Sequence, residues 1–222
     1  MTMKLYGTPP TRAIKPLWLL NELDLDYEMI VVNIPAGEHL QPAFQALNPA
    51  GKVPVLVDGD IVLAESSAIT MYLAERYGGG RFIPAAAGER ARMDQWILFL
   101  ITEIEQPLWR IALHKSIYPE AERRAEECTL AERDCRRMLA PLERHMADRT
   151  YFVGTEPTVA DFTGAYTLDW ADNAGFLDQS PNLKRFVEHM YERPAAPPKI
   201  GEAFAELRGG VMPPSRRQTA CA

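Results

Sequence analysis

The segment that decides the fold is residues 48–66, which read NPAGKVPVLVDGDIVLAES. Two β-branched apolar runs, 53–57 and 61–63, flank Asp58-Gly59, a dipeptide typical of a two-residue hairpin turn. A loop bearing proline and glycine precedes the first run, and an apolar helical pattern over 66–77 follows the second. The segment therefore predicts a loop, an antiparallel hairpin and a helix in direct succession.

The residues before this segment predict two strands joined by a helix. The expected elements are a strand over 3–6, a turn over 7–10, a helix over 12–25, a strand over 27–32 and a short helix over 41–47. A helix that connects two strands of one sheet favours a right-handed parallel crossover. The order β-α-β-α-β-β-α thus predicts an α/β thioredoxin-like domain over residues 1–80, followed by a linker over 81–87.

The rest of the chain predicts an all-α helical domain over residues 88–222. Helical patterns cover 89–113, 120–146, 158–172, 182–192 and 198–207, and the tail from about 209 to 222 is expected to be mobile. One stripe of the second helix has spacings of three and four residues and consists of Cys128, Ala131, Cys135, Met138 and Leu142. This periodicity favours two core cysteines over a redox or metal-binding role.

Composition narrows the function classes. The 222 residues carry a formal charge of −6, which argues against nucleic acid or an anionic membrane as a partner. The start of the chain lacks a signal peptide pattern, and no apolar run is long enough to span a membrane. Three cysteines, Cys128, Cys135 and Cys221, are interpreted as reduced thiols, so a cytoplasmic location without a metal site is expected.

Residues 48–54 followed by Glu65-Ser66 resemble the glutathione transferase family, and the resemblance extends over nearly the whole chain. It implies a thioredoxin-like N-terminal glutathione-binding domain and an all-helical C-terminal domain. The stretch 36–39, with Pro42 and Leu47-Asn48-Pro49 after it, is similar to the delta and theta classes. The resemblance is therefore to a bacterial, serine/threonine-type member.

The resemblance implies a set of glutathione-binding residues: His39, Lys52, Val53, Pro54, Glu65 and Ser66. In the family, the peptide bond before the proline is cis, and the preceding residue pairs its backbone with the cysteinyl part of glutathione. The serine holds the γ-glutamyl carboxylate, the acid meets its ammonium group, and Lys52 and His39 suit the glycine carboxylate. The simpler alternatives are a trans proline that starts a strand, a plain helix cap at Glu65-Ser66 and a surface histidine.

The thiol of glutathione also needs an activating hydroxyl, and Thr8 and Thr11 are the candidates. A hydroxyl that donates a hydrogen bond at a helix N-terminus stabilises a thiolate. In serine-type members the hydroxyl precedes a basic residue by four positions, which Thr11 and Lys15 match, so Thr11 is preferred. The family usually has serine there, so threonine is a departure. Tyr6 lies too far ahead of the helix and is expected to pack.

Two further groups come from the second half of the chain. Thr158 and Asp161, which follow the sequence Tyr-Phe-Val-Gly at 151–154, are similar to the family's capping box, a structural and not a catalytic motif. The electrophile is expected between the domains. The residues proposed to line its pocket are Trp109, Arg110, His114 and Tyr118, and each of them suits packing or surface roles equally well.

These features predict a glutathione transferase that activates glutathione as a thiolate for attack on a hydrophobic electrophile. Glutathione is expected as co-substrate, without a metal, and the chain as a homodimer. One alternative is a specialised glutathione-dependent lyase, dehalogenase or isomerase. Another is a non-catalytic interaction protein, which the threonine in place of serine keeps open.

Overall fold

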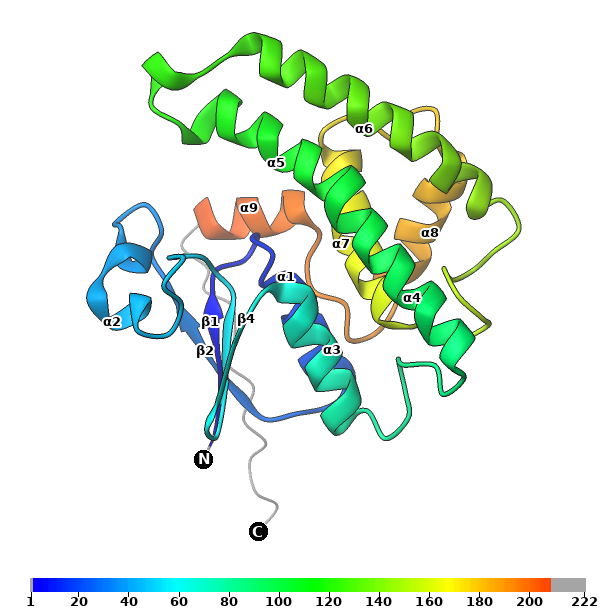
Figure 1. Cartoon of the computed structure of the whole chain (residues 1–222), viewed down its shortest axis with the longest axis horizontal. Helices are drawn as coiled ribbons and strands as arrows, with labels where there is room; N and C mark the ends of the chain where they lie inside the picture. Colours follow the sequence, from blue (N-terminus) through cyan, green and yellow to red (C-terminus); the bar gives the residue numbers. More distant parts are fainter. Residues whose placement is uncertain (1, 209–222) are drawn as a thin grey trace. The chain divides into compact units, whose positions relative to one another are not determined.

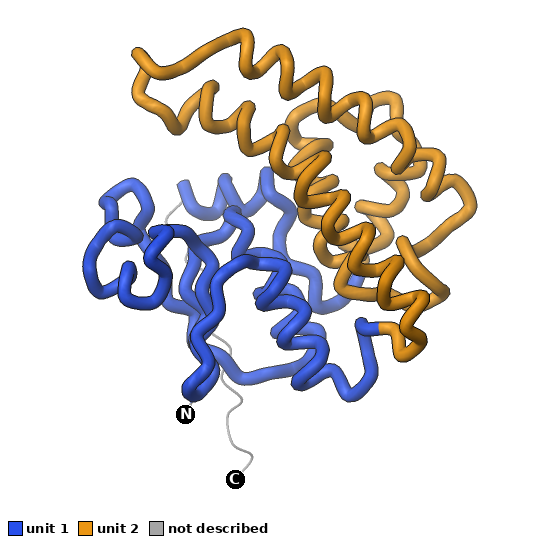
Figure 2. The backbone as a smooth tube through the Cα atoms, viewed as in Figure 1, with its two compact units in different colours: residues 1–83, 193–222 blue, residues 84–192 orange. Residues whose placement is uncertain are grey.

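The computed structural model describes residues 2–208, and its contacts divide the chain into two units (Figure 2). Unit 1 contains residues 1–83 and the chain from Arg193 onward, and unit 2 contains Pro84–Glu192. The division differs at its C-terminal end from the expected helical domain over 88–222. Arg193 forms a two-pronged ion pair with Glu22, at 2.6 Å from Nε to Oε1 and 2.7 Å from the guanidinium to Oε2. This pair joins the returning chain to the end of the first helix of unit 1.

Unit 1 contains a mixed four-stranded sheet. Its strands are β1 (Met3–Gly7), β2 (Tyr27–Val31), β3 (Val55–Asp58) and β4 (Ile61–Ala64), in the order β2-β1-β3-β4. Strands β1 and β2 are parallel, and β3 is antiparallel to both β1 and β4. The predicted parallel crossover and the predicted hairpin are both confirmed.

The helices of unit 1 are α1 (Ile14–Glu22), α2 (Pro42–Gln45), α3 (Ser66–Tyr77) and α9 (Ile200–Arg208), with a 3₁₀ turn, η1, at Glu38–Leu40. Figure 1 shows α1 and α3 together on one side of the sheet and α2 on the other. Helix α1 begins later than predicted. Its first turn is tightened by bonds from the Ile14 N–H to the Thr11 carbonyl and from the Lys15 N–H to the Arg12 carbonyl, and Pro16 has no N–H to give.

Unit 2 is helical throughout its regular elements. The first long run comprises α4 (Ala87–Phe99), the π-helical η2 (Leu100–Glu105), α5 (Gln106–Ala112) and the π-helical η3 (Leu113–Ile117). The later helices are α6 (Ala125–His145), α7 (Val159–Asn173) and α8 (Pro181–Tyr191). The prediction that the second helix starts at 120 is wrong. Residues 120–122 form a separate 3₁₀ turn, η4, and the extended backbone of Arg123 and Arg124 interrupts the helix before Ala125.

The predicted stripe of α6 is a core feature except at Met138, which is half-buried. Cys128 and Cys135 are free thiols and buried, together with Ala131 and Leu142 on the same face. Burial raises the pKa of the Cys135 thiol to about 12, which makes it a poor nucleophile. Cys221 and the tail predicted to be mobile lie outside the described residues.

The length and mean hydropathy of each described helix indicate whether it could cross a membrane. Within residues 2–208, none of the helices combines the length and apolar character required to span a bilayer.

Candidate functional site

The candidate residues of unit 1 converge at one edge of its sheet. Tyr6 pairs with Val55 and Val55 with Ala64, and in the next row Gly7 pairs with Val31. Strands β1, β2 and β4 end at these two adjacent rows, and β3 begins there. The residues that follow or precede these strand ends along the chain are Thr8, Val32, Pro54 and Glu65. Segments far apart in sequence are thereby brought to one place.

The turn between β1 and α1 distinguishes the two candidate hydroxyls. Thr8 is buried, and its Oγ1 donates a hydrogen bond of 2.6 Å to the Val32 carbonyl. Thr11 is half-buried, and its Oγ1 accepts the N–H of Ala13 at 3.3 Å. The single proton of Thr8 is therefore used inside the fold. The proton of Thr11 has no acceptor within the described chain and remains available to a ligand.

Tyr6 packs, as expected of a strand tyrosine. Its ring meets the ring of Phe44 edge to face, with centroids 6.4 Å apart. The pair adjoins a small apolar cluster with Val32 and Val55. This contact gives Tyr6 a packing role beside the edge.

The loop before β3 has the conformation predicted from its sequence. The Val53–Pro54 peptide bond is cis. The Asn48 side chain, which the sequence argument did not single out, holds the loop through two bonds. Its Nδ2 donates to the Lys52 carbonyl at 2.7 Å, and its Oδ1 accepts the Ala50 N–H at 3.1 Å.

Gly51 brings this loop against η1. Gly51 has a φ of +60°, and a Cβ on it would lie 3.1 Å from the carbonyl oxygen of His39, so the two backbones approach closely. The His39 side chain carries a buried Nδ1 without a hydrogen-bond partner among the described groups. Lys52, next to Gly51, is exposed. Both candidate ligands of the glycine carboxylate therefore stand on one pair of touching loops.

The start of α3 leaves its polar groups available. Glu65 lies at the N-cap with a φ of +68°, a conformation rare for a residue with a side chain, and no side chain caps the helix. The Glu65 side chain is exposed, whereas Ser66 is only 6% exposed. The Ser66 carbonyl accepts the Thr70 hydroxyl at 2.7 Å. The N–H groups and positive dipole end of α3 thus face the edge without a capping side chain.

The start of α7 shows the opposite pattern and confirms the predicted capping box. The Asp161 carboxylate is fully buried and accepts the N–H and the hydroxyl of Thr158, at 2.7 and 2.9 Å. It also accepts the Phe152 N–H at 2.8 Å. Burial raises the pKa of Asp161 to about 7, against the opposing effect of these bonds. The Asp161 carboxylate and its donors on Thr158 and Phe152 are therefore bonded to one another within the fold.

His145 completes the support of Phe152. Its Nε2 lies 3.0 Å from the Phe152 carbonyl, and its ring lies 4.1 Å from the Trp96 ring between centroids. Burial lowers the pKa of His145, with the Phe152 hydrogen bond acting in the other direction. The Phe152 backbone is therefore held on one side by the end of α6 and on the other by the start of α7.

The proposed electrophile-lining residues lie on α5, on η3 and just after it. Arg110 points its charge at α6, where its guanidinium lies 3.1 Å from Asp134. His114 meets the Tyr118 ring edge to face at 5.1 Å, and its Nδ1 accepts the Arg124 N–H at 3.3 Å. Trp109 is half-buried. The contacts of Arg110, His114 and Tyr118 support packing within unit 2.

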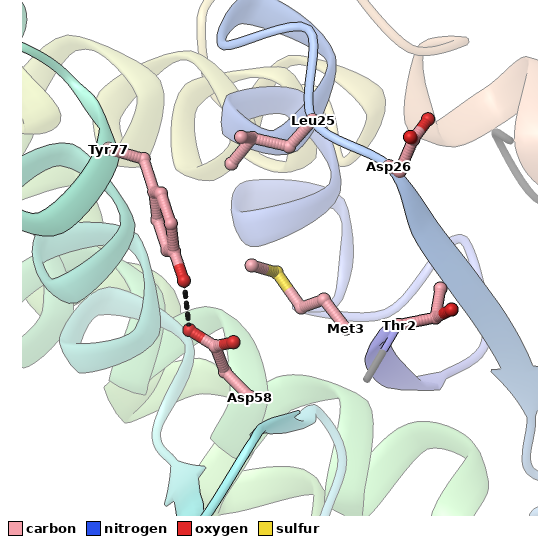
Figure 3. A pocket seen from close by; sticks show the side chains of 6 residues that line it. All are labelled: Thr2, Met3, Leu25, Asp26, Asp58 and Tyr77. Carbon is pink, nitrogen blue, oxygen red and sulfur yellow. Dashed lines mark hydrogen bonds between the residues drawn. The ribbon is translucent and has the colours of Figure 1, made fainter. Parts of the chain in front are cut away.

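A cavity of about 440 Å³ lies at the other end of β3, away from the candidate site (Figure 3). Asp58 lines it and accepts the hydroxyls of Tyr72 and Tyr77 on one carboxylate oxygen, at 2.8 and 2.5 Å. Burial and the neighbouring Asp58 raise the pKa of Tyr77 to about 12. The two bonds tie the hairpin to the end of α3.

Two domain models of one protein family match this chain. The one described as "Glutathione S-transferase, N-terminal domain" matches residues 1–75, and "Glutathione S-transferase, C-terminal domain" matches residues 98–194. Among similar proteins, "Glutathione S-transferase 3" of Zea mays is 32% identical over 87% of this chain and 90% of its own length. "Glutathione S-transferase GstB" of Escherichia coli strain K12 is 31% identical over 83% of this chain and 90% of its own length.

Structural comparison gives the same family. The glutathione transferase URE2P6 of Phanerochaete chrysosporium, solved in complex with oxidized glutathione, is 27% identical and has a TM-score of 0.79. The match covers 95% of this chain and 97% of that one. The chain belongs to the glutathione S-transferase family, and the predicted thioredoxin-like domain with a following helical domain is its fold.

Proposed function

We propose that this protein is a glutathione transferase in which the Thr11 hydroxyl stabilises the thiolate of bound glutathione. One observation carries the choice of Thr11. Thr8 donates its only hydroxyl proton to the Val32 carbonyl, whereas Thr11 accepts the Ala13 N–H and has its proton available. A donated hydrogen bond favours the ionised form of a thiol and lowers its pKa.

The remaining contacts to glutathione are proposed from the same edge of the sheet. The α3 N-terminus, with the Ser66 hydroxyl, receives the γ-glutamyl carboxylate, because it offers N–H groups and a positive dipole without a capping side chain. The exposed Glu65 carboxylate receives the γ-glutamyl ammonium group. The backbone of Val53, ahead of Pro54, pairs with the cysteinyl unit.

Lys52 and His39 take the glycine carboxylate in this proposal. The close approach of Gly51 to His39 supports their cooperation, because it fixes the two loops against each other. The buried Nδ1 of His39 is a polar atom for which the described chain offers no partner. Burial without a partner costs free energy, and a ligand's hydrogen bond would recover part of it.

The second substrate is proposed to be a hydrophobic electrophile. With a chlorinated nitrobenzene, the thiolate sulfur bonds to the ring carbon that carries chlorine. Chloride leaves with the electron pair of the broken carbon–chlorine bond, and the thiol proton passes to solvent. Trp109, Arg110, His114 and Tyr118 remain the candidates to contact the electrophile.

The finer classification belongs to the same proposal. We infer a bacterial, serine/threonine-type enzyme with a delta/theta-like N-terminal domain, supported by the spacing of Thr11 and Lys15 and by the similarity to GstB. A homodimer is proposed from the family resemblance, and light scattering on the purified protein measures it. A cytoplasmic location is supported by the two described cysteines, which are free thiols.

Turnover of a chlorinated nitrobenzene by wild type and Thr11→Val tests the function. The valine keeps the shape of threonine and removes the donor, so the thiol pKa of bound glutathione should rise. Turnover at neutral pH should fall about ten-fold for each unit of that rise. The ultraviolet absorbance of the thiolate, titrated against pH, measures the change directly, and calorimetry should show nearly unchanged glutathione affinity.

Two results would count against the proposal. Absence of turnover in the wild type, with glutathione bound, would favour the non-catalytic interaction protein. A Thr11→Val titration curve that coincides with the wild-type curve would remove Thr11 from the chemistry. Thr11→Ser, which keeps the hydroxyl, serves as the matched control and should retain activity.

A further inference from the structure

Thr8 occupies a connecting position in the turn that carries Thr11. Its side chain is 9% exposed, and the Val32 residue that accepts its hydroxyl proton is 4% exposed. The bond is short, at 2.6 Å, and joins residues 24 positions apart in sequence. Thr8 thereby ties the turn after β1 to the end of β2.

The backbone of Thr8 continues this connection to Thr11. The Thr8 carbonyl accepts the Thr11 N–H at 2.9 Å, and the Thr11 carbonyl accepts the Ile14 N–H at 3.1 Å. The Thr11 hydroxyl in turn accepts the Ala13 N–H at 3.3 Å. A continuous set of hydrogen bonds therefore runs from the end of β2 to the Thr11 side chain.

Packing at Gly7 restricts the turn from the inner side. A Cβ on Gly7 would lie 2.6 Å from the Cβ of Ala13, so the end of β1 already touches the start of α1. The Val32 N–H also donates to the Gly7 carbonyl at 3.2 Å, which anchors Val32 itself. The turn therefore has a fixed anchor at Val32 and no room to collapse toward the strand.

We propose that Thr8 is a positioning residue, which orients the Thr11 hydroxyl and does not touch the thiolate. This inference rests on the proposed role of Thr11. Without the Thr8 hydroxyl, the turn loses its side-chain bond to Val32 and keeps only the backbone bond between Val32 and Gly7, so the Thr11 hydroxyl samples more orientations. Fewer of these orientations point the proton at the sulfur, so the thiolate is less stabilised.

The experiment compares Thr8→Val, Thr11→Val and the double variant with wild type. The readouts are the thiolate titration of bound glutathione, turnover at neutral pH, and glutathione affinity by calorimetry. Thr8→Val should raise the thiol pKa by about half a unit, which is about a three-fold loss of turnover. Affinity should stay near that of wild type, because the proposed γ-glutamyl contacts lie on α3.

Three features separate positioning from a general loss of structure. Thr8→Ser keeps the donor and should restore the wild-type titration. In the Thr11→Val background, Thr8→Val should cause no further shift, because Thr8 acts through Thr11. Tyr72→Phe removes a 2.8 Å hydroxyl bond at the other end of β3 in the same unit, and should leave the titration unchanged.

The outcomes distinguish this inference from the proposed function. If the thiolate titration shifts in Thr11→Val but not in Thr8→Val, the positioning role of Thr8 is overturned and the proposed role of Thr11 stands. A shift in Thr8→Val without one in Thr11→Val makes Thr8 the direct donor and overturns both. If the thiolate titration shifts in neither Thr8→Val nor Thr11→Val, both are overturned.

Two further results would overturn the inference alone. In one, the effects of Thr8→Val and Thr11→Val on the thiolate titration add up in the double variant. In the other, Tyr72→Phe shifts the titration as much as Thr8→Val does.

Thr8→Ala removes the same donor with less bulk, and takes the place of Thr8→Val if the valine variant does not fold.

Discussion

Helices α3 and α7 both begin with an acid and a hydroxyl close together, yet they use them in opposite ways. At α7, the Asp161 carboxylate is fully buried and accepts three hydrogen bonds from Thr158 and Phe152. At α3, Glu65 is exposed on backbone with a φ of +68°, and no side chain caps the helix. The same residue types therefore close one helix end and leave the other open.

The difference separates structural from ligand-binding roles. Polar groups that are buried and fully bonded stabilise the fold, and their removal leaves other buried groups without partners. A helix N-terminus with uncapped N–H groups attracts a carboxylate. We therefore expect substitutions at α7 to change stability, and substitutions at α3 to change glutathione binding.

The largest effect is expected for Asp161→Ala. The substitution leaves two buried N–H groups and a hydroxyl without their acceptor, so the free energy of unfolding should fall by about 3 kcal/mol. Turnover per folded molecule should stay close to wild type. Thermal unfolding and activity of the folded fraction measure the two quantities. An unchanged melting temperature with lost turnover would reverse the assignment of α7.

Local signals explain why much of the fold was predictable. The Asp58-Gly59 dipeptide identifies the hairpin, and the helix predicted over 66–77 has the bounds observed for α3. Signals that act at a distance were missed. One contact of the C-terminal segment with the rest of unit 1 is the ion pair of Glu22 and Arg193, which are 171 positions apart. No local periodicity reports such a contact.

The candidate site was predictable to the extent that a motif contains it. Pro54 and Glu65-Ser66 lie in the segment that resembles the glutathione transferase family, and the cis bond before Pro54 is observed as predicted. Asn48 and Val32 were missed as supports, because their roles depend on where a backbone carbonyl points. The preference for Thr11 over Thr8 likewise gained support only when the direction of the Thr8 hydroxyl bond was known.

The second largest effect is expected for Ser66→Ala, on binding. Loss of the hydroxyl leaves a charged group of the ligand with one partner fewer, so glutathione affinity should weaken by about 1–3 kcal/mol. The neighbouring Ser67 supplies a matched control in the same first turn of α3, because the proposed contact with the γ-glutamyl carboxylate uses the hydroxyl of Ser66 and not that of Ser67. Calorimetry should therefore find Ser67→Ala close to wild type. Equal losses in both variants would contradict the assigned carboxylate position.

The backbone conformation of Glu65 allows its effects on ligand binding and on stability to be measured separately. Glu65→Ala and Glu65→Gly both remove the carboxylate and should weaken glutathione binding alike. Only glycine adopts a φ of +68° without strain, so Glu65→Gly should be more stable than Glu65→Ala by about 1 kcal/mol. Urea unfolding of the two variants measures this difference. Equal stability would mean that the α3 start carries no backbone strain.

The smallest effect is expected at His145, beside the α7 start. Burial lowers the pKa of His145 from its usual 6.5, so the folded state disfavours the protonated ring. The stability linked to this group is present above pH 6.5 and is lost as pH falls through the lowered pKa.

Because His145 is half-buried and solvent screens its charge, the loss of stability between pH 7 and pH 5 should be small. His145→Gln has an amide in place of the titrating ring, and Asp161 titrates in both proteins. The difference between their stabilities, measured by urea unfolding at several pH values, therefore isolates His145. Wild type should lose more stability than His145→Gln as pH falls. Parallel curves would show that the end of α6 does not sense pH, and would leave Asp161 as the titrating support of Phe152.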